Sequence, residues 1–151
     1  MHAIAATGAG FLVAVLWFDL MFDVQTRRHA GETLPVDVLI SIAGYYRRVT
    51  TQARPMNQLI PAVMLVTVVS IVIEIVKGGD DLWAGWISLV LATSGIGLAM
   101  ARTVRNAVRL GGSKEPIKVR TDLARSIYRD HLYCLAAMLA TVVLQLTAVA
   151  G

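Results

Sequence analysis

The first long apolar stretch of the chain, residues 4–22, reads IAATGAGFLVAVLWFDLMF. It contains one acid, Asp19, and it is long enough to cross the hydrocarbon core of a bilayer as a helix, which takes roughly 20 residues. Three similar stretches follow, at residues 58–76, 82–101 and 132–150. The sequence therefore predicts an all-α integral membrane four-helix bundle, with one transmembrane domain over residues 1–151.

The composition supports a membrane protein. Of the 151 residues, 56% are apolar and 16% are charged, whereas soluble domains average roughly 45–50% apolar and about 25% charged residues. This excess of apolar residues excludes a disordered chain, a secreted disulfide scaffold and a soluble nucleic-acid-binding protein. The lipid bilayer is the expected partner, and the single cysteine, Cys134, cannot form an internal disulfide.

Basic residues are concentrated in two long loops. Residues 25–54 and 102–131 together hold 13 of the 14 Lys and Arg residues. Positively charged loops tend to stay on the cytoplasmic side of a membrane. We therefore predict a multi-pass protein of the cell membrane, with both long loops cytoplasmic and both termini outside. The basic loops are also expected to attract anionic lipid headgroups.

Both loops are predicted to contain helices. In the first loop, apolar residues follow the spacing i, i+4, i+7 and i+11 at Val38, Ile42, Tyr45 and Val49. This pattern predicts an amphipathic cytoplasmic helix that lies along the membrane surface or, alternatively, packs against the other cytoplasmic segments. In the second loop, the third helix is expected to end at Gly111 and Gly112, and a new helix to begin around Thr121.

Polar side chains occur near the same predicted end of all four membrane helices. Asp19 and Asp23 share one face of the first helix because they lie four residues apart. The other candidates are at the start of the second helix, at the end of the third and at the start of the fourth: Asn57, Arg102, Arg105, Asn106 and His131. Acids inside a membrane are costly and tend to mark functional sites, so we treat this set as the candidate site.

Two interpretations of the candidate site remain open. In the functional one, Asp19 or His131 acts as a general base. Asp23, Asn57, Arg102, Arg105 and Asn106 then bind the substrate. Among them, Arg102, Arg105 or Asn57 stabilises an enolate or phenolate oxygen. In the structural one, the two aspartates only neutralise arginines that reach to the interface. The functional interpretation predicts a cavity bounded by Asp19, Asn57, Asn106 and His131.

Two further expectations concern groups outside this set. Glu74 lies near the other end of the second helix, three residues before Lys77, and the two are expected to form a surface pair. No Cys and His spacing typical of a zinc site and no glycine-rich phosphate loop occurs in the sequence. We therefore expect neither a metal nor a cofactor.

The order of the polar motifs resembles the small four-helix membrane proteins that are grouped with anthrone oxygenases. The resemblance rests on the glycine-rich first stretch, on Pro55 and Asn57, on RTVRNAVRLG at residues 102–111, and on His131. It implies a cofactor-free oxygenase that acts on polycyclic phenolic substrates, with Asn57, Asn106 and His131 as polar site positions. Asp19 and Asp23 are not part of the motif.

Three classes of function follow from the sequence. The first is a membrane protein that binds or converts a lipophilic aromatic molecule in a polar pocket in the cytoplasmic half of the bundle. The second is a non-catalytic accessory subunit of a larger membrane complex. The third is a small transporter that uses Asp19 and Asp23 as a proton or cation site, and it requires a homo-oligomer because four helices rarely enclose a pathway alone.

Overall fold

The computed structural model of the chain describes residues 1–78 and 82–150, and within these ranges the fold is all-helical without β-strands. The four longest helical segments are α1 (His2–Asp23), α3 (Met56–Lys77), α4 (Leu82–Leu98) and α6 (Ile117–Ala150). The 3₁₀ turn η1 (Val24–Arg28) extends α1, and the π-helical turn η3 (Ala99–Thr103) joins α4 to α5 (Val104–Gly112). All four segments are long and apolar enough to cross a membrane, which confirms this part of the expected fold.

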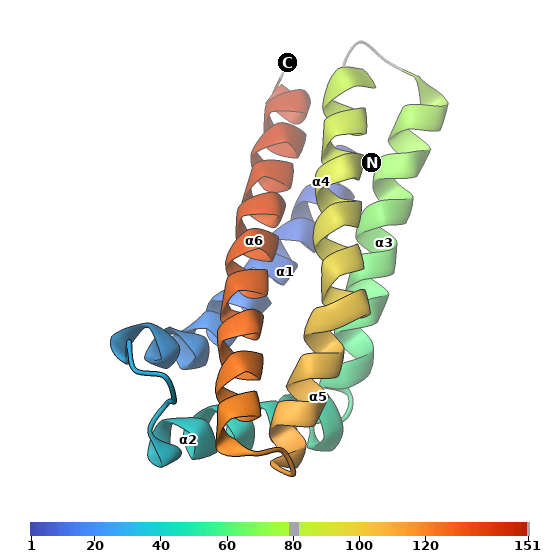
Figure 1. Cartoon of the computed structure of the whole chain (residues 1–151). Helices are drawn as coiled ribbons and strands as arrows, with labels where there is room; N and C mark the ends of the chain where they lie inside the picture. Colours follow the sequence, from blue (N-terminus) through green and yellow to red (C-terminus); the bar gives the residue numbers. More distant parts are fainter. Residues whose placement is uncertain (79–81, 151) are drawn as a thin grey trace.

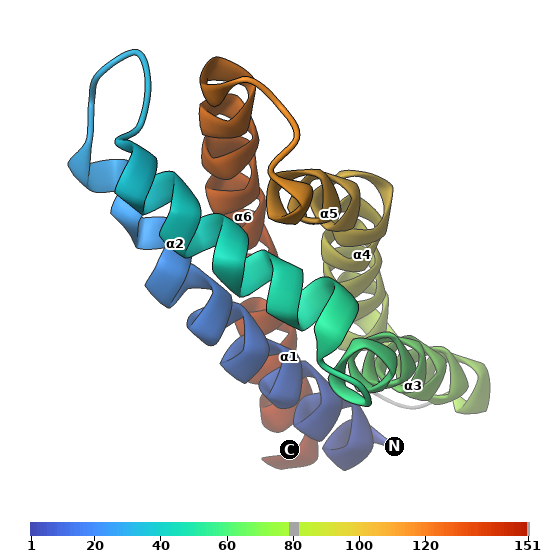
Figure 2. The ribbon, with the colours of Figure 1, turned by 90° about the horizontal axis from the view of Figure 1, so that it is seen from below.

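The four long helices pack into a bundle in which each contacts two neighbours. α6 packs against α1 and α4, and α3 packs against the same two helices from the other side (Figure 1). α2 (Val36–Arg47), followed by the π-helical turn η2 (Arg48–Gln52), lies across one end of this bundle, as the view from below shows (Figure 2). We call this end the α2 end, and the end that carries the N-terminus of α1 the far end.

The interior of the bundle contains an apolar core of three alanines and three larger side chains. Its buried members are Ala5, Ala9, Leu12, Ile71, Ala92 and Met138. A Cβ added at Gly8 would collide with the hydroxyl of Thr67, so α1 and α3 can approach this closely only because residue 8 has no side chain. Large apolar residues such as Leu65, Val90 and Val143 point outward on the surface of the bundle, as expected for helices surrounded by lipid.

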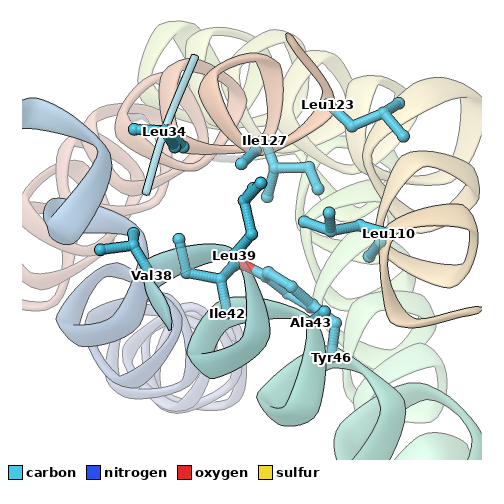
Figure 3. Close-up of a cluster of buried hydrophobic side chains, with 11 residues drawn as sticks. Leu34, Val38, Leu39, Ile42, Ala43, Tyr46, Leu110, Leu123 and Ile127 are labelled. Atoms are coloured by element: carbon cyan, nitrogen blue, oxygen red, sulfur yellow. The ribbon is translucent and has the colours of Figure 1, made fainter. Parts of the chain in front are cut away.

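A second apolar core fixes α2 to the end of the bundle. Figure 3 shows Leu39, Ile42 and Tyr46 of α2 facing Leu110 of α5 and Ile127 of α6. The first-loop helix therefore packs against other loop segments, which was the second of its two expected placements.

The buried face of α2 agrees with the predicted stripe at two of its four positions. Val38 and Ile42 are buried, whereas Tyr45 and Val49 are only partly buried. The buried face extends instead to Leu39, Ala43 and Tyr46, each one residue after a predicted position. α2 docks closely on α5, where a Cβ added at Gly111 would lie 2.9 Å from the backbone nitrogen of Arg47.

The ends of the loop helices agree only in part with the sequence. The expected stop at Gly111 and Gly112 is confirmed, because α5 ends at Gly112 and Ser113 adopts a left-handed conformation with φ of 53°. The expected start at Thr121 is wrong, since α6 begins at Ile117. Thr121 is buried in the first turns of α6, where its hydroxyl donates to the carbonyl oxygen of Ile117 and accepts from the backbone N–H of Leu34.

Candidate functional site

Five polar side chains meet where α1, α2 and α6 converge at the α2 end. They are Asp19 and Asp23 of α1, Tyr45 and Tyr46 of α2, and His131 of α6, and we call them the acid–histidine cluster. The spacing of four residues places both aspartates on the same face of α1. The structure thus brings together three of the predicted site residues, Asp19, Asp23 and His131.

Asp23 is the most deeply buried member of the cluster. Its side chain is fully buried, and both of its carboxylate oxygens accept hydrogen bonds. The hydroxyl of Tyr46 donates to Oδ1 at 2.7 Å, and Nδ1 of His131 donates to Oδ2 at 2.7 Å. A buried carboxylate is tolerated when its oxygens are hydrogen-bonded in this way. The same bond orients the ring, because it places the proton of a neutral His131 on Nδ1.

Asp19 lies on the other side of the imidazole ring. Its Oδ1 accepts a hydrogen bond of 2.7 Å from the hydroxyl of Tyr45, and its Oδ2 lies 3.8 Å from Nε2 of His131. That distance is too long for a hydrogen bond. His131 therefore stands between two carboxylates, with Nδ1 engaged and Nε2 without a hydrogen bond to the described residues. The side chain of Asp19 is 14% exposed, so this corner is the more open part of the cluster.

The two tyrosines act as hydrogen-bond donors to the carboxylates. Burial raises the pKa of the Tyr46 phenol well above its usual range, and the charges of Asp23 and Asp19 raise it further. Burial followed by the charge of Asp19 likewise raises the pKa of Tyr45. Both phenols consequently stay protonated near neutral pH. Tyr45 also stacks on Phe22 with ring centroids 4.1 Å apart, and this pair covers the cluster between α1 and α2.

Arg102 belongs to an adjacent pair rather than to the cluster itself. Its guanidinium contacts both carboxylate oxygens of Asp130, with Nε 2.9 Å from Oδ2, and the hydroxyl of Thr103 donates to Oδ2 at 3.2 Å. Asp130 is buried and directly precedes His131 in the chain. The pair therefore holds α6 against the π turn η3 beside the cluster. Asp130 is absent from the sequence candidates, although an acid beside His131 and opposite a basic segment was a usable signal.

The remaining candidates do not reach the cluster. Arg105 is exposed and folds back onto the carbonyl oxygen of Ala101. Arg102 lies within the π turn η3, which closes its hydrogen bonds over five residues, and Arg105 follows in α5. Asn106 is half-buried, and Asn57 is half-buried with a shielded Oδ1 that accepts no hydrogen bond from the described residues.

The expected cavity does not take the predicted form. Asp19 and His131 are neighbours, but neither Asn57 nor Asn106 contacts them through a hydrogen bond among residues 1–78 and 82–150. An open hollow of about 480 Å³ does occur at the α2 end, lined by Thr26, Arg27, Asp122, Arg125, Tyr128 and Arg129. Within the described part of the chain, no group of three His, Cys, Asp or Glu side chains is placed to hold a metal ion.

The expected surface pair of Glu74 and Lys77 is wrong. The side chain of Glu74 is only 7% exposed, and its Oε2 lies 3.3 Å from Nδ1 of His2 at the far end. The same His2 nitrogen hydrogen-bonds to Oε1 of Gln145 at 2.9 Å. Glu74 turns inward because it lies on the buried face of α3, seven residues after Thr67. The spacing of seven residues between Thr67 and Glu74 can be read from the sequence, and it places both side chains on the same helix face.

Comparisons of this chain with family models, with curated proteins and with solved structures found no match. The resemblance to the anthrone oxygenase group therefore rests on the motif residues alone.

Proposed function

We propose that the chain spans a membrane and that its acid–histidine cluster accepts a proton from a flat, lipophilic phenol or enolisable ketone. The observation that carries this proposal is the hydrogen bond of 2.7 Å between Asp23 and Nδ1 of His131, together with the absence of such a bond at Nε2 among the described residues. A carboxylate on Nδ1 fixes the tautomer whose Nε2 carries the lone pair. Histidine general bases are oriented in this way.

The charge balance of the cluster suits proton transfer. When Nε2 takes a proton from the substrate, the electron pair of the broken bond remains on the substrate as an enolate or phenolate. The positive charge then lies on the ring of His131, where Asp23 at 2.7 Å and Asp19 at 3.8 Å stabilise it. General base catalysis of this kind contributes roughly 10²–10⁴-fold to a rate. Asp19 thus supports the base instead of competing with it.

Asn57 is the substrate-binding residue that the proposal retains. Its shielded Oδ1 has no hydrogen-bond donor among the described residues, and an unsatisfied buried acceptor costs roughly 1–3 kcal/mol. A substrate hydroxyl is a suitable donor. Asn57 does not contact the cluster, and it is retained because of this buried acceptor alone. Arg102 takes a positioning role through Asp130. Arg105 and Asn106 are left out because, among the described residues, neither has a buried polar atom without a hydrogen-bond partner.

The resemblance to anthrone oxygenases suggests the following chemical step. The enolate of an anthrone reacts with dioxygen, so that its CH₂ group becomes C=O and one molecule of water is released. Dioxygen is the oxidant, and it takes up the four electrons lost by the carbon. The protein's own contribution in this scheme is to form and hold the enolate.

The distribution of basic residues supports the placement of the cluster in the membrane. Because 13 of the 14 Lys and Arg residues fall in residues 25–54 and 102–131, we propose that the α2 end faces the cytoplasm. The cluster then lies in the cytoplasmic half of the bundle, close to the interface. A lipophilic substrate would approach it from the bilayer, beside the stacked Phe22 and Tyr45.

Absorption spectroscopy tests the proposal, because the enolate of anthrone absorbs at longer wavelength than the neutral ketone. Anthrone is titrated into the detergent-solubilised protein near neutral pH and without oxygen. The wild type should increase the enolate fraction above that in empty micelles, and His131→Gln should abolish the increase. His29→Gln is the matched control, since the imidazole of His29 has a single hydrogen bond within residues 1–78 and 82–150, to the carbonyl oxygen of Gln25. Equal spectra for His131→Gln and the wild type would overturn the proposal.

A specific observation favours proton transport as a second candidate. The bundle carries titratable groups at both ends, with Glu74 and His2 at the far end and the acid–histidine cluster at the α2 end. An oligomer that joins the two groups by water would conduct protons. Under this alternative, liposomes with the wild type dissipate a pH gradient, and Glu74→Gln removes the flux. If liposomes that contain the wild type keep their pH gradient, proton transport is excluded.

A further inference from the structure

We propose that the hollow between η1 and the first half of α6 binds the phosphate headgroup of an anionic phospholipid. The hollow measures about 480 Å³ and is shallow and largely open. Its lining residues come from two segments far apart in sequence: Thr26 and Arg27 of η1, and Asp122, Arg125, Tyr128 and Arg129 of α6. No member of the acid–histidine cluster lines it, so the inference rests on the proposed membrane placement of the chain but not on the proposed proton transfer.

The charge of the hollow fits an anion. Its lining includes three arginines, Arg27, Arg125 and Arg129, and a single acid, Asp122. Arginine is the side chain best suited to phosphate, because its planar fork donates two parallel hydrogen bonds to phosphate oxygens. Arg27 and Arg129 are exposed, and neither side chain has a hydrogen bond or ion pair within residues 1–78 and 82–150. Their donors are therefore available to a ligand.

Arg125 is held in place by the protein. One of its terminal nitrogens donates to the carbonyl oxygens of His29 and Gly31, at 3.1 and 2.6 Å. These bonds join α6 to the loop that follows η1, and they use only one of the three guanidinium nitrogens. The other two nitrogens keep their donors. The central arginine of the hollow is thus oriented before any ligand arrives, which lowers the entropic cost of binding.

The hollow extends from the headgroup layer to just beyond it, with Arg129 inside the layer and Arg125 on its outer side. The last apolar segment of the chain begins at Leu132, so Arg129 lies three residues and Arg125 seven residues outside it. At 1.5 Å per residue these positions are roughly 5 and 10 Å beyond the hydrocarbon core. Lipid headgroups occupy roughly the first 5–8 Å beyond that core. Tyr128, between the two arginines in sequence, is a residue type enriched at this depth.

The outer face of α6 offers a path for an acyl chain. Leu132, Leu139 and Leu146 follow Arg125 at intervals of seven residues, and each leucine is exposed, by 43%, 45% and 54%. Residues at this spacing share one helix face. The charged hollow therefore continues into an apolar stripe that runs toward the far end. A free phosphate would use the hollow alone, whereas a phospholipid contacts both parts.

Native mass spectrometry of the full-length protein in detergent tests the proposal, with phosphatidylglycerol and phosphatidylcholine titrated separately. The wild type should retain one phosphatidylglycerol per chain in preference to phosphatidylcholine. The double variant Arg125→Gln/Arg129→Gln should bind about tenfold more weakly for each arginine removed, the factor that corresponds to about 1.4 kcal/mol. Asp122→Asn should bind more tightly, and a gain of binding cannot result from misfolding.

The matched control is Arg48→Gln/Arg54→Gln, which removes the same charge from exposed positions outside the hollow. It should leave lipid retention unchanged. Equal losses in the two double variants, or equal retention of both lipids by the wild type, would overturn the proposal. Displacement of the lipid by millimolar inorganic phosphate would assign the hollow to a soluble phosphate compound and overturn the lipid assignment. Retention in the presence of phosphate supports the lipid.

Discussion

Replacement of Asp23 by asparagine is the perturbation whose effect follows most directly from the structure. The fully buried carboxylate accepts one hydrogen bond from Tyr46 and one from His131, both of 2.7 Å. Hydrogen bonds to a charged group contribute roughly 1.5–3 kcal/mol each. Asparagine removes the negative charge and places an amide N–H₂ where the second acceptor was, so both charge-assisted hydrogen bonds are lost or replaced by weaker neutral ones. We expect Asp23→Asn to lower the free energy of unfolding by about 3 kcal/mol.

Thermal unfolding in detergent, followed by circular dichroism, measures this loss. For a chain of this size 1 kcal/mol corresponds to roughly 2–4 °C, so the melting temperature should fall by about 6–12 °C. Asp37→Asn is the matched control, because Asp37 is an exposed acid in the first turn of α2. Its removal should cost below about 1 kcal/mol. An Asp23→Asn protein that melts together with the Asp37→Asn protein would refute the hydrogen-bonded arrangement.

A double-mutant cycle separates the contribution of Tyr46. If the phenol and the carboxylate interact directly, the loss of unfolding free energy in the double variant should differ from the sum of the losses in Asp23→Asn and Tyr46→Phe. The difference should exceed about 0.5 kcal/mol. Additive losses would show that the two side chains contribute independently. That result would place Tyr46 in the apolar core beneath α2 instead of in the cluster.

Three further outcomes are expected. Gly111→Ala should destabilise the protein by roughly 1–3 kcal/mol, because the new Cβ would lie 2.9 Å from a backbone nitrogen of α2. Gly112→Ala has open space around its Cβ and should be neutral or slightly stabilising in the same thermal assay. The pKa of the Tyr46 phenol is raised in the folded state. The protonated phenol therefore contributes fully to stability below its ordinary pKa of about 10, and this contribution is lost as the pH rises further. The melting temperature of the wild type should consequently fall more steeply above about pH 10 than that of Tyr46→Phe. In a variant without the native cysteine, Ser113→Cys should react with an impermeant thiol reagent only after the cells are opened, and Lys77→Cys should react in intact cells; the reverse pattern would invert the proposed orientation.

The sequence predicted the parts of the molecule that depend on helical periodicity alone. The four membrane helices follow from the length of the apolar stretches, and Asp19 and Asp23 share a face because they are four residues apart. His131 meets them because it lies at the same depth on a neighbouring antiparallel helix. These relations need only 3.6 residues per turn and 1.5 Å per residue.

The parts that the sequence did not predict depend on contacts between segments. Tyr46 faces Asp23 because α2 docks on Gly111, and nothing within residues 34–54 specifies that contact. Arg105 lies outside the site, on the carbonyl oxygen of Ala101, and the α-helix before it is interrupted after Leu98 by a π turn that no residue in that segment signals. Glu74 is different, since its position on the buried face of α3 was readable from the sequence.

The central claim is that His131, oriented by Asp23, removes a proton from an enolisable substrate. Deuterium exchange measures that step without any oxidation. Anthrone is incubated with the detergent-solubilised protein in D₂O under argon, and mass spectrometry follows deuterium uptake at its acidic CH₂ group. We predict that the wild type accelerates uptake above the rate in empty micelles, that His131→Gln does not, and that His29→Gln behaves like the wild type. Uptake by the wild type at the micelle rate, or unchanged acceleration in His131→Gln, would contradict the claim.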